Sequence, residues 1–199
     1  MRVLPFLLLC SAAMLSACGT DDLASSTPTS GNPSTGSGSP GTTPPATSTT
    51  SQRQTDLNAV MLAEHNAARA EVGVPAMQLD AELSRQALAY AEEMARTGVF
   101  AHSPSSARIN QGENLWAGTK DAFEYKDMSG AWIEEKQFYI HAPFPDVSIT
   151  GDWHDVGHYT QIIWKNSTRL GCGIATGMNR DWLVCRYSPP GNFIGQMTY

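Results

Sequence analysis

Two imidazoles and two carboxylates in this sequence have the chemistry of a divalent-metal site or an acid–base site. His102 stands in the run FAHS, Glu113 in GENLW and His158 in GHYTQ, while Glu135 lies in a stretch that reads as a helix. Imidazole and carboxylate are common zinc ligands, and both groups transfer protons in general acid–base catalysis. Spacing alone does not bring the four together, so their convergence is a hypothesis.

Glu135 interrupts an otherwise apolar helix face. The helix is expected over about 121–140, with a break near Gly130, and its apolar stripe consists of Met128, Ala131, Trp132, Phe138 and Tyr139. Glu135 falls inside this stripe, whereas Glu134 lies off it. A buried carboxylate is costly unless it is paired, so a cation, a hydrogen-bond donor or a metal should meet Glu135. The alternatives are a helix that ends near Trp132, or a Glu135 that faces a solvated cleft.

Hydrophobic periodicity predicts helices in the first part of the domain and strands at its end. Helices are expected over about 55–72, 80–97 and 121–140, and strands over 159–164, 170–175 and 182–187. Asp80 should cap the second helix and Gly98 should end it. Residues 100–118 read as a loop, and residues 178–181 as a hairpin turn. Helices first and strands last indicate an α+β fold in which helices cover an antiparallel sheet.

The first 17 residues have the pattern of an export signal, with Arg2, then a mainly apolar run, then small residues. The run LSAC ending at Cys18 resembles the lipobox of bacterial lipoproteins. That resemblance implies cleavage before Cys18, lipidation of Cys18 and a membrane anchor in the bacterial cell envelope. Gly19 in place of Asp favours the outer membrane in a Gram-negative host. The alternative is an ordinary secretory signal, a chance cysteine and an extracellular protein.

Residues 18–53 are expected to form the lipidated cysteine and a disordered linker. Of the 35 residues from 19 to 53, 27 are Gly, Ser, Thr or Pro. Such a segment cannot bury enough apolar surface to offset its ordering entropy. The sequence therefore predicts a signal peptide over 1–17, a tether over 18–53 and one folded domain over 54–199.

Composition and charge exclude some classes of protein. The 199 residues carry 13 Lys and Arg against 19 Asp and Glu, a formal net charge of −6. A basic footprint for nucleic acid is therefore absent. No uncharged apolar run of 18 residues follows the first 20 positions, so the sequence predicts no membrane-spanning helix in the body of the protein.

Several motifs, in a fixed order, resemble one known family. The run GHYTQIIWKNS at 157–167 is similar to the first signature of the CAP superfamily, which comprises cysteine-rich secretory proteins, antigen 5 and pathogenesis-related 1 proteins. The run VCRYSPPGNF at 184–193 is similar to the second signature. HNAAR at 65–69, GENL at 112–115 and a W-x-x-E spacing ending at Glu135 match as well. The resemblance covers nearly all of the expected domain, and its end looks closest to the plant pathogenesis-related 1 branch.

This resemblance implies a three-layer α-β-α sandwich around a central, largely antiparallel sheet. It places the family's cavity tetrad on His102, Glu113, Glu135 and His158. In some members the two histidines hold a divalent metal such as Zn²⁺, and other members bind sterols or fatty acids. The family mostly lacks an established reaction, although peptidase activity has been proposed for a few members.

Cys172 and Cys185 stand on the two strands of the expected hairpin. In an exported protein, two such cysteines most simply form a disulfide. The alternatives are two free thiols or a metal-binding pair. Many secreted eukaryotic members of the family carry six or more cysteines, so the loops that their extra disulfides tie should be freer here.

Two other patterns are rejected as functional motifs. HDVGH at 154–158 is similar to the zinc-protease pattern H-E-x-x-H, which needs both histidines on one helix face. Gly157 and the strand expected after it argue against that helix, although His154 could still lie near the cavity. The run GCGIATG at 171–177 is faintly similar to a dinucleotide-binding loop, but no helix is expected after it.

Three functions are compatible with these features. The favoured one is a tethered or secreted binding module whose His/Glu cavity takes a divalent metal, with a further small-molecule, lipid or protein ligand unidentified. The second is a metal-assisted hydrolase acting on peptide or cell-wall substrates, with Glu113 or Glu135 as general base. The third, a lipid or sterol carrier, rests on family analogy alone.

Overall fold

The computed structural model describes residues 46–199, with side chains from Ser51 onward. The expected export signal, Cys18 and the linker up to residue 45 lie outside the described residues. Among the helices of the described part, none is long and apolar enough to cross a bilayer.

Four α-helices, three short 3₁₀ helices and four strands make up the described part of the chain. In chain order they are α1 (Ala46–Glu71), β1 (Gln78–Leu79), α2 (Ala81–Thr97), η1 (Ser105–Ala107), β2 (Gly112–Thr119), α3 (Tyr125–Ile133), η2 (Glu134–Phe138), η3 (Trp153–Asp155), α4 (Gly157–Ile162), β3 (Arg169–Gly177) and β4 (Arg180–Ser188). The strand order in the sheet is β1-β3-β4-β2. β1 runs parallel to β3, and the other neighbouring pairs are antiparallel.

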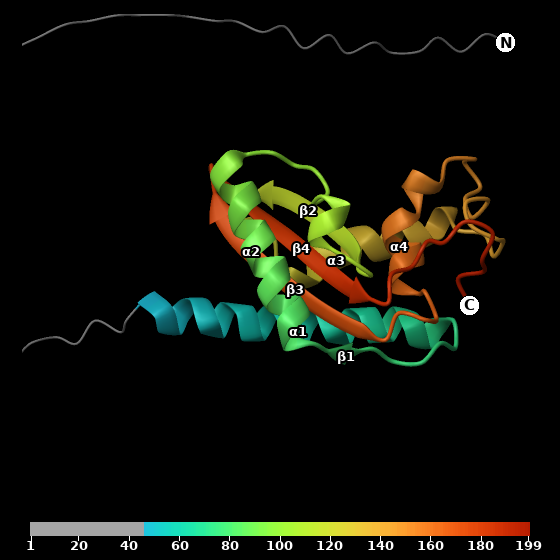
Figure 1. Ribbon diagram of the computed structural model, residues 1–199, viewed down its shortest axis with the longest axis horizontal. Helices are drawn as coiled ribbons and strands as arrows, with labels where there is room; N and C mark the ends of the chain where they lie inside the picture. The colour runs from blue at the N-terminus through green and yellow to red at the C-terminus, as the bar shows by residue number, and fades with distance from the viewer. Residues whose placement is uncertain (1–45) are drawn as a thin grey trace, which may run out of the picture. The chain divides into compact units, whose positions relative to one another are not determined.

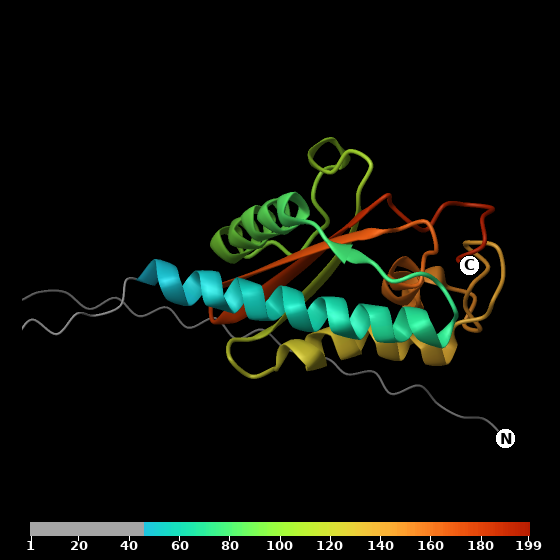
Figure 2. The ribbon, with the colours of Figure 1, turned by 90° about the horizontal axis from the view of Figure 1, so that it is seen from below.

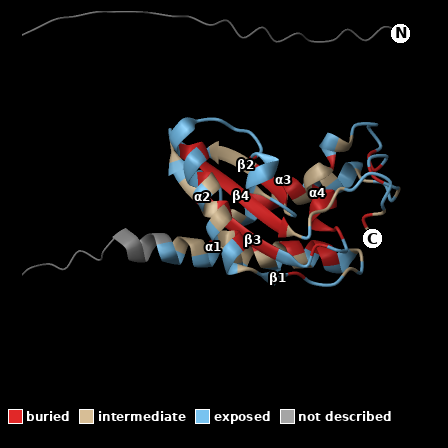
Figure 3. Ribbon diagram, viewed as in Figure 1, coloured by how far each residue is buried: buried red, intermediate tan, exposed pale blue. Residues whose placement is uncertain are grey.

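The sheet lies between two layers of helices (Figures 1 and 2). α2 covers one face, where Ala87 and Ala91 pack with Trp182 and Val184 of β4. α1, α3 and α4 cover the other face and form the larger core. Its buried residues include Leu57, Met61, Met128, Trp132, Tyr159, Ile162, Leu170, Cys172, Leu183, Cys185 and Tyr187. Figure 3 shows the central strands buried between these layers. The α+β class and the α-β-α sandwich are confirmed.

Glycines at alternate positions of β3 let α2 lie directly on the strand. A Cβ at Gly173 would lie 2.1 Å from the backbone nitrogen of Leu88, and one at Gly171 would lie 2.2 Å from that of Ser84. Because strand residues alternate between faces, both glycines face the helix. The glycine run at 171–177 therefore serves close helix–sheet contact, and it leads into a hairpin rather than a nucleotide-binding helix.

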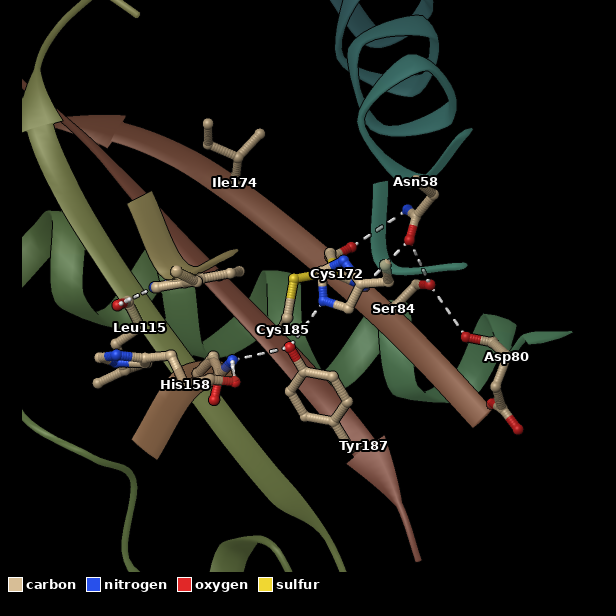
Figure 4. The surroundings of a disulfide bond; sticks show 12 residues. Asn58, Asp80, Ser84, Leu115, His158, Cys172, Ile174, Cys185 and Tyr187 are labelled. Carbon is tan, nitrogen blue, oxygen red and sulfur yellow. Dashed lines mark hydrogen bonds between the residues drawn. A yellow bond between two sulfur atoms is a disulfide. The ribbon is translucent and has the colours of Figure 1, made fainter. Parts of the chain in front are cut away.

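Side chains of α1 replace a strand along the outer edge of β3, where β1 pairs with only two residues. The amide Nδ2 of Asn58 donates to the carbonyl oxygen of Cys172 at 3.1 Å, and its Oδ1 accepts from the Cys172 nitrogen at 3.0 Å (Figure 4). The nitrogen of Ile174 donates to Gln54 Oε1 at 3.2 Å. These contacts satisfy edge-strand groups that would otherwise be open to another chain.

The expected disulfide is confirmed. Cys172 on β3 lies directly opposite Cys185 on β4, and the two sulfurs are bonded (Figure 4). Both residues are fully buried in the core beneath α1. The bridge therefore joins two neighbouring strands at the centre of the molecule, where solvent does not reach the sulfurs.

The predicted second helix and final hairpin are confirmed. Asp80 caps α2 by accepting hydrogen bonds from the nitrogens of Glu82 and Leu83, and Gly98 ends it in the left-handed conformation. In the hairpin, Met178 and Asn179 have φ angles of 53° and 58°. Positive φ at both loop positions is the geometry of a two-residue turn that matches strand twist.

Two element predictions were wrong. Residues 159–164 form the main part and the end of α4 rather than a strand. All six residues are buried, so the alternating pattern of their side chains does not separate a buried strand face from an exposed one. Residues 112–118, expected within a loop, form β2 together with Thr119. Its Gly-Glu-Asn start has low strand propensity, and pairing with β4 along eight residues overrides that preference.

Two boundaries also differ from expectation. α1 begins at Ala46, before residue 54. Arg53, expected to be in the linker, binds the sheet, because it donates to Thr176 Oγ1 and forms an ion pair with Asp181, both at 2.9 Å. The predicted third helix breaks after Ile133 rather than near Gly130, and continues as the 3₁₀ helix η2.

Candidate functional site

A cavity of about 540 Å³ opens beside the start of β2 and the segment after β4. Three of the four predicted site residues line it, namely His102, Glu113 and His158. Glu135 is absent from the lining and lies behind His158. The other lining residues are Arg108, Gln111, Gly112, Asn114, Phe144, Pro145, Trp153, His154, Gly157, Gln161, Pro190, Gly191, Asn192 and Ile194.

His102 reaches the cavity from the segment after α2 and is held by Glu113 of β2. Nδ1 of His102 lies 2.8 Å from Oε1 of Glu113, whose side chain is fully buried. The same carboxylate accepts hydrogen bonds from the nitrogen and the hydroxyl of Ser103, at 2.9 and 2.8 Å. A carboxylate partner places the proton on Nδ1 of His102, so Nε2 can accept a metal or a ligand proton.

Arg186 of β4 neutralises the buried Glu113. The two residues are direct cross-strand neighbours, and Nε of Arg186 lies 2.9 Å from Oε2 of Glu113. The contact is an ion pair, because the angle at the Nε–H is unsuitable for a hydrogen bond. Arg186 also donates to Ser103 Oγ at 3.0 Å and to Gln111 Oε1 at 3.1 Å. Burial opposes ionisation of Glu113, but hydrogen bonds from His102 and Ser103 and the Arg186 charge hold its pKa below the usual value.

Glu135 of η2 binds His158 and the first turn of α4. Its Oε1 lies 2.6 Å from Nδ1 of His158, and its Oε2 accepts from the nitrogens of His158 and Tyr159, each at 3.0 Å. The first nitrogens of a helix lack partners within it, so a carboxylate there satisfies donors that would stay unpaired. Glu135, the carboxylate that interrupts the predicted apolar stripe, is therefore paired with hydrogen-bond donors.

The ring and backbone of His158 have further support from both neighbouring layers. Trp132 of α3 stacks on the imidazole, with centroids 5.9 Å apart and planes 17° apart, and donates from Nε1 to the carbonyl of Leu115. Asn114 of β2 donates to the carbonyl of His158 at 3.2 Å and to the Tyr187 hydroxyl at 3.0 Å. The orientation of His158 is thus fixed by packing and hydrogen bonds together.

His65 and Arg69 of α1 hold the fold together and do not line the cavity. His65 Nε2 lies 2.8 Å from the Tyr187 hydroxyl, and burial lowers the pKa of His65 to about 4. Arg69 donates to the carbonyls of Ile162 and Trp164 at the end of α4, at 2.7 and 2.9 Å, and burial lowers its pKa to about 10. α4 is therefore held at its start by Glu135 and at its end by Arg69.

Gln161 joins α4 to the two backbone segments beside the cavity. Its Oε1 accepts from the nitrogen of Gly191 at 2.8 Å, and its Nε2 donates to Ser167 Oγ at 3.0 Å. A Cβ at Gly112 would lie 2.1 Å from the same Oε1. Glycine at the start of β2 therefore allows the strand to approach this buried amide.

The structure brings the tetrad together as two carboxylate–histidine pairs rather than as four converging side chains. Both histidines have Nδ1 engaged by a carboxylate, and their side chains are 55% and 34% exposed. Imidazoles that are partly exposed and have Nδ1 engaged in this way suit a divalent metal such as Zn²⁺ at Nε2. Within the described residues, no group of three or more His, Cys, Asp or Glu side chains is already arranged to hold an ion.

Sequence reasoning missed the residues that support the tetrad. Ser103 and Arg186 hold Glu113, Asn114 and Trp132 hold His158, and none of the four was proposed as a site residue. Arg186 offered a signal, because an arginine within a predicted buried strand needs a carboxylate partner. The partner could not be chosen without the register that places Glu113 opposite it.

The rejected motif HDVGH proves to be split between two helices. His154 lies in η3 and His158 in α4, with Val156 at φ −136° between them. The expected strand was the wrong reason for the rejection, but the two histidines do not share one continuous helix face. His154 nevertheless lines the same cavity as His158.

Comparisons with known proteins agree with the motifs. A family model described as "Cysteine-rich secretory protein family" (CAP) matches residues 62–187. Pathogenesis-related protein 1C of Nicotiana tabacum is 37% identical over 139 residues, which are 69% of this chain and 78% of that protein. Pathogenesis-related leaf protein 4 of Solanum lycopersicum is 40% identical over 139 residues, covering 69% and 80% respectively.

A solved structure has the same architecture. The crystal structure of NaASP2 with Zn²⁺ matches with a TM-score of 0.63 at 25% identity, covering 72% of this chain and 85% of the other. The family match spans more than half of the chain, and the relatives are similar over most of their own lengths. This chain therefore belongs to the cysteine-rich secretory protein (CAP) family.

Proposed function

We propose that this protein is an exported CAP-domain binding module whose cavity binds one divalent cation through Nε2 of His102 and Nε2 of His158. The observation that carries the proposal is the carboxylate at Nδ1 of each histidine, at 2.8 and 2.6 Å. Histidines that bind metal characteristically donate their other ring N–H to a carboxylate, which fixes the tautomer and raises the basicity of the ligating nitrogen. A bound cation would supply open coordination positions to a second ligand in the cavity.

The donor set favours zinc or a similar first-row metal. Imidazole nitrogen is a preferred ligand for zinc, copper and nickel, whereas magnesium and calcium prefer oxygen. Two protein nitrogens leave further positions for water or a ligand. The structural relative NaASP2, crystallised with Zn²⁺, adds support from within the family.

In this proposal Glu113 and Glu135 orient the histidines rather than bind the metal. Each carboxylate already accepts three hydrogen bonds, and Glu113 also faces the buried charge of Arg186. A general base must be free to take a proton from water or substrate. The engagement of both carboxylates therefore favours the binding module over the hydrolase.

We also propose that Cys18 carries the lipid anchor and that the Ser/Thr/Pro-rich segment after it tethers the domain to the cell envelope. The buried Cys172–Cys185 disulfide supports export, because such bonds persist in oxidising compartments. The secretory character of the family points the same way. Labelling with a radioactive fatty acid, lost in Cys18→Ser, would test the anchor.

Calorimetric zinc titration near neutral pH tests the metal site. The full chain carrying Cys18→Ser, which stays unlipidated, is compared with the same chain carrying His102→Ala or His158→Ala. We expect one zinc per chain and loss of binding in both variants. His141→Ala is the matched control, because His141 is exposed and contacts the ring of Tyr199 away from the cavity lining. Failure of the unsubstituted cavity to bind micromolar zinc would contradict the proposal.

A further inference from the structure

We propose that His154 is a third imidazole of this metal site, and that Asp152 positions it. The inference rests on the proposed function, and it concerns a residue that lies outside the tetrad. His154 is carried by η3, four residues before His158, and it lines the same cavity as His102 and His158. Zinc sites that bind a further molecule usually have three protein ligands and one open position, and three imidazoles are one such ligand set.

A shared environment separates the three cavity histidines from the other two histidines of the chain. Each cavity histidine has Nδ1 within 2.6–2.8 Å of one carboxylate oxygen, from Glu113, Asp152 or Glu135. His65 instead contacts the Tyr187 hydroxyl through Nε2 and is fully buried, and His141 packs against the ring of Tyr199. Of the five histidines, the three that have a carboxylate at Nδ1 are therefore the three that line the cavity. This is expected if the cavity uses their Nε2 atoms.

Asp152 holds His154 in the same way that Glu135 holds His158. Oδ1 of Asp152 accepts from the nitrogen of His154 at 2.9 Å and lies 2.7 Å from its Nδ1. Glu135 makes the corresponding contacts with His158 at 3.0 and 2.6 Å. In each case one carboxylate fixes both the backbone and the ring of one histidine. The hydrogen bonds to His154 also hold the pKa of Asp152 below its usual value.

An aromatic ring also stacks on each of these two imidazoles. The Trp153 ring lies 3.9 Å from that of His154, with planes 27° apart, and Trp153 itself packs against Phe144 of the cavity wall. Trp132 stacks in the same manner on His158. Stacking limits rotation of the ring in the metal-free protein, so less side-chain entropy is lost when the metal binds.

His154 is the most exposed of the three imidazoles. Its side chain is 68% exposed, against 55% for His102 and 34% for His158. No three metal-binding side chains of the described part are already arranged around one point. In the proposal the ion therefore binds first to His102 and His158, and His154 joins it while keeping its contacts with Asp152 and Trp153.

Zinc titration of the unlipidated full chain, with four variants, tests this inference. His154→Ala should weaken zinc binding by more than about tenfold, since removing a ligand has a larger effect than removing its hydrogen-bond partner. Asp152→Asn should weaken it by about tenfold, and His141→Ala should leave it unchanged. His102→Ala should abolish binding. His154 and Asp152 are exposed, so circular dichroism should show all of their variants folded.

X-ray absorption of the zinc-loaded chain supplies a second readout that does not depend on affinity. We expect three imidazole ligands in the unsubstituted chain and two in His154→Ala. If His154→Ala matches His141→Ala in affinity and both retain two imidazoles, the inference is overturned and the two-histidine site stands. If the unsubstituted chain binds no zinc, the proposed function fails and this inference fails with it.

Discussion

Glu113 of β2 and Arg186 of β4 face each other across the sheet, fully buried as side chains, with carboxylate and guanidinium 2.9 Å apart. The pair lies beneath His102, so the charge that orients a cavity histidine is itself balanced inside the protein. Burial lowers the pKa of Arg186, yet the negative charge of Glu113 opposes that effect. The pair therefore links the stability of the sheet to the geometry of the cavity.

Arg186→Met should destabilise the fold by about 3–5 kcal/mol, because it leaves the Glu113 charge buried without its cation. Urea denaturation measures the effect, and the double variant Glu113→Gln/Arg186→Met should recover part of the loss. Arg85→Met is the control, since Arg85 forms an exposed ion pair with Glu82 and should change little. Equal effects of Arg186→Met and Arg85→Met would show that the buried pair is not what stabilises this region.

Gly173→Ala should destabilise the protein by at least about 2 kcal/mol, because its Cβ would lie 2.1 Å from the backbone of α2 and force the helix away from the sheet. Gly130→Ala is the matched control. Gly130 is in α3, and a Cβ added there would have nothing within 4 Å, so alanine should stabilise by about 0.5–1 kcal/mol. Thermal unfolding of both variants checks the opposite signs, and equal shifts would refute the close-contact role of Gly173.

His65 should make stability fall in mild acid. Burial lowers its folded-state pKa from 6.5 to about 4, so the unfolded chain binds a proton between these values while the folded chain does not. The contribution of His65 to the free energy of unfolding is therefore complete above about pH 6.5, and it is lost as the pH falls toward 4. Between pH 7.5 and 5 the loss should be about 2 kcal/mol.

Urea midpoints of the unsubstituted chain and His65→Gln at several pH values isolate this contribution. The variant is less stable at pH 7.5 because it disturbs the contact with Tyr187, but its stability should fall less steeply with acid. Parallel curves for the two proteins would mean that His65 is not the group that titrates.

Removing the disulfide should destabilise the domain by about 3 kcal/mol, because the bridge closes a short loop across a sequence separation of 13 residues. The variant Cys172→Ala/Cys185→Ala and chemical reduction of the unsubstituted chain should agree. Unfolding of the variant with and without reductant is the control, and it should not change. A stable reduced protein would argue that packing of the buried sulfurs, rather than the bond, carries the stabilisation.

Glu135→Gln should weaken zinc binding by about 10–100-fold, because the amide no longer supplies an anionic acceptor to Nδ1 of His158. Glu134→Gln is the control, since Glu134 is the neighbouring carboxylate and is exposed. Calorimetry at one pH compares both with the unsubstituted chain. Unchanged affinity in Glu135→Gln, with the fold intact, would remove the orienting role assigned to this carboxylate.

The sequence was sufficient wherever a signal is local. Asp80 and Gly98 mark the ends of α2 by their own backbone preferences, and the turn after Gly177 contains Asn179, a residue type that tolerates positive φ. Glu135 could likewise be singled out, because a carboxylate within an apolar stripe demands a partner wherever the chain goes. The motifs and their order identified the family, and the family resemblance implied the sandwich architecture.

Only the tertiary structure decided how the site is assembled. Residues 159–164 became a helix because the core surrounds them on every side, which removes the periodicity that distinguishes strand from helix. The strand register placed Glu113 opposite Arg186, and the break at Val156 separated His154 from His158 while leaving both on one cavity. These contacts join residues that are far apart in the chain, or they depend on the packing around them. Local sequence preferences therefore identify the candidate site residues but not the partner that each one contacts.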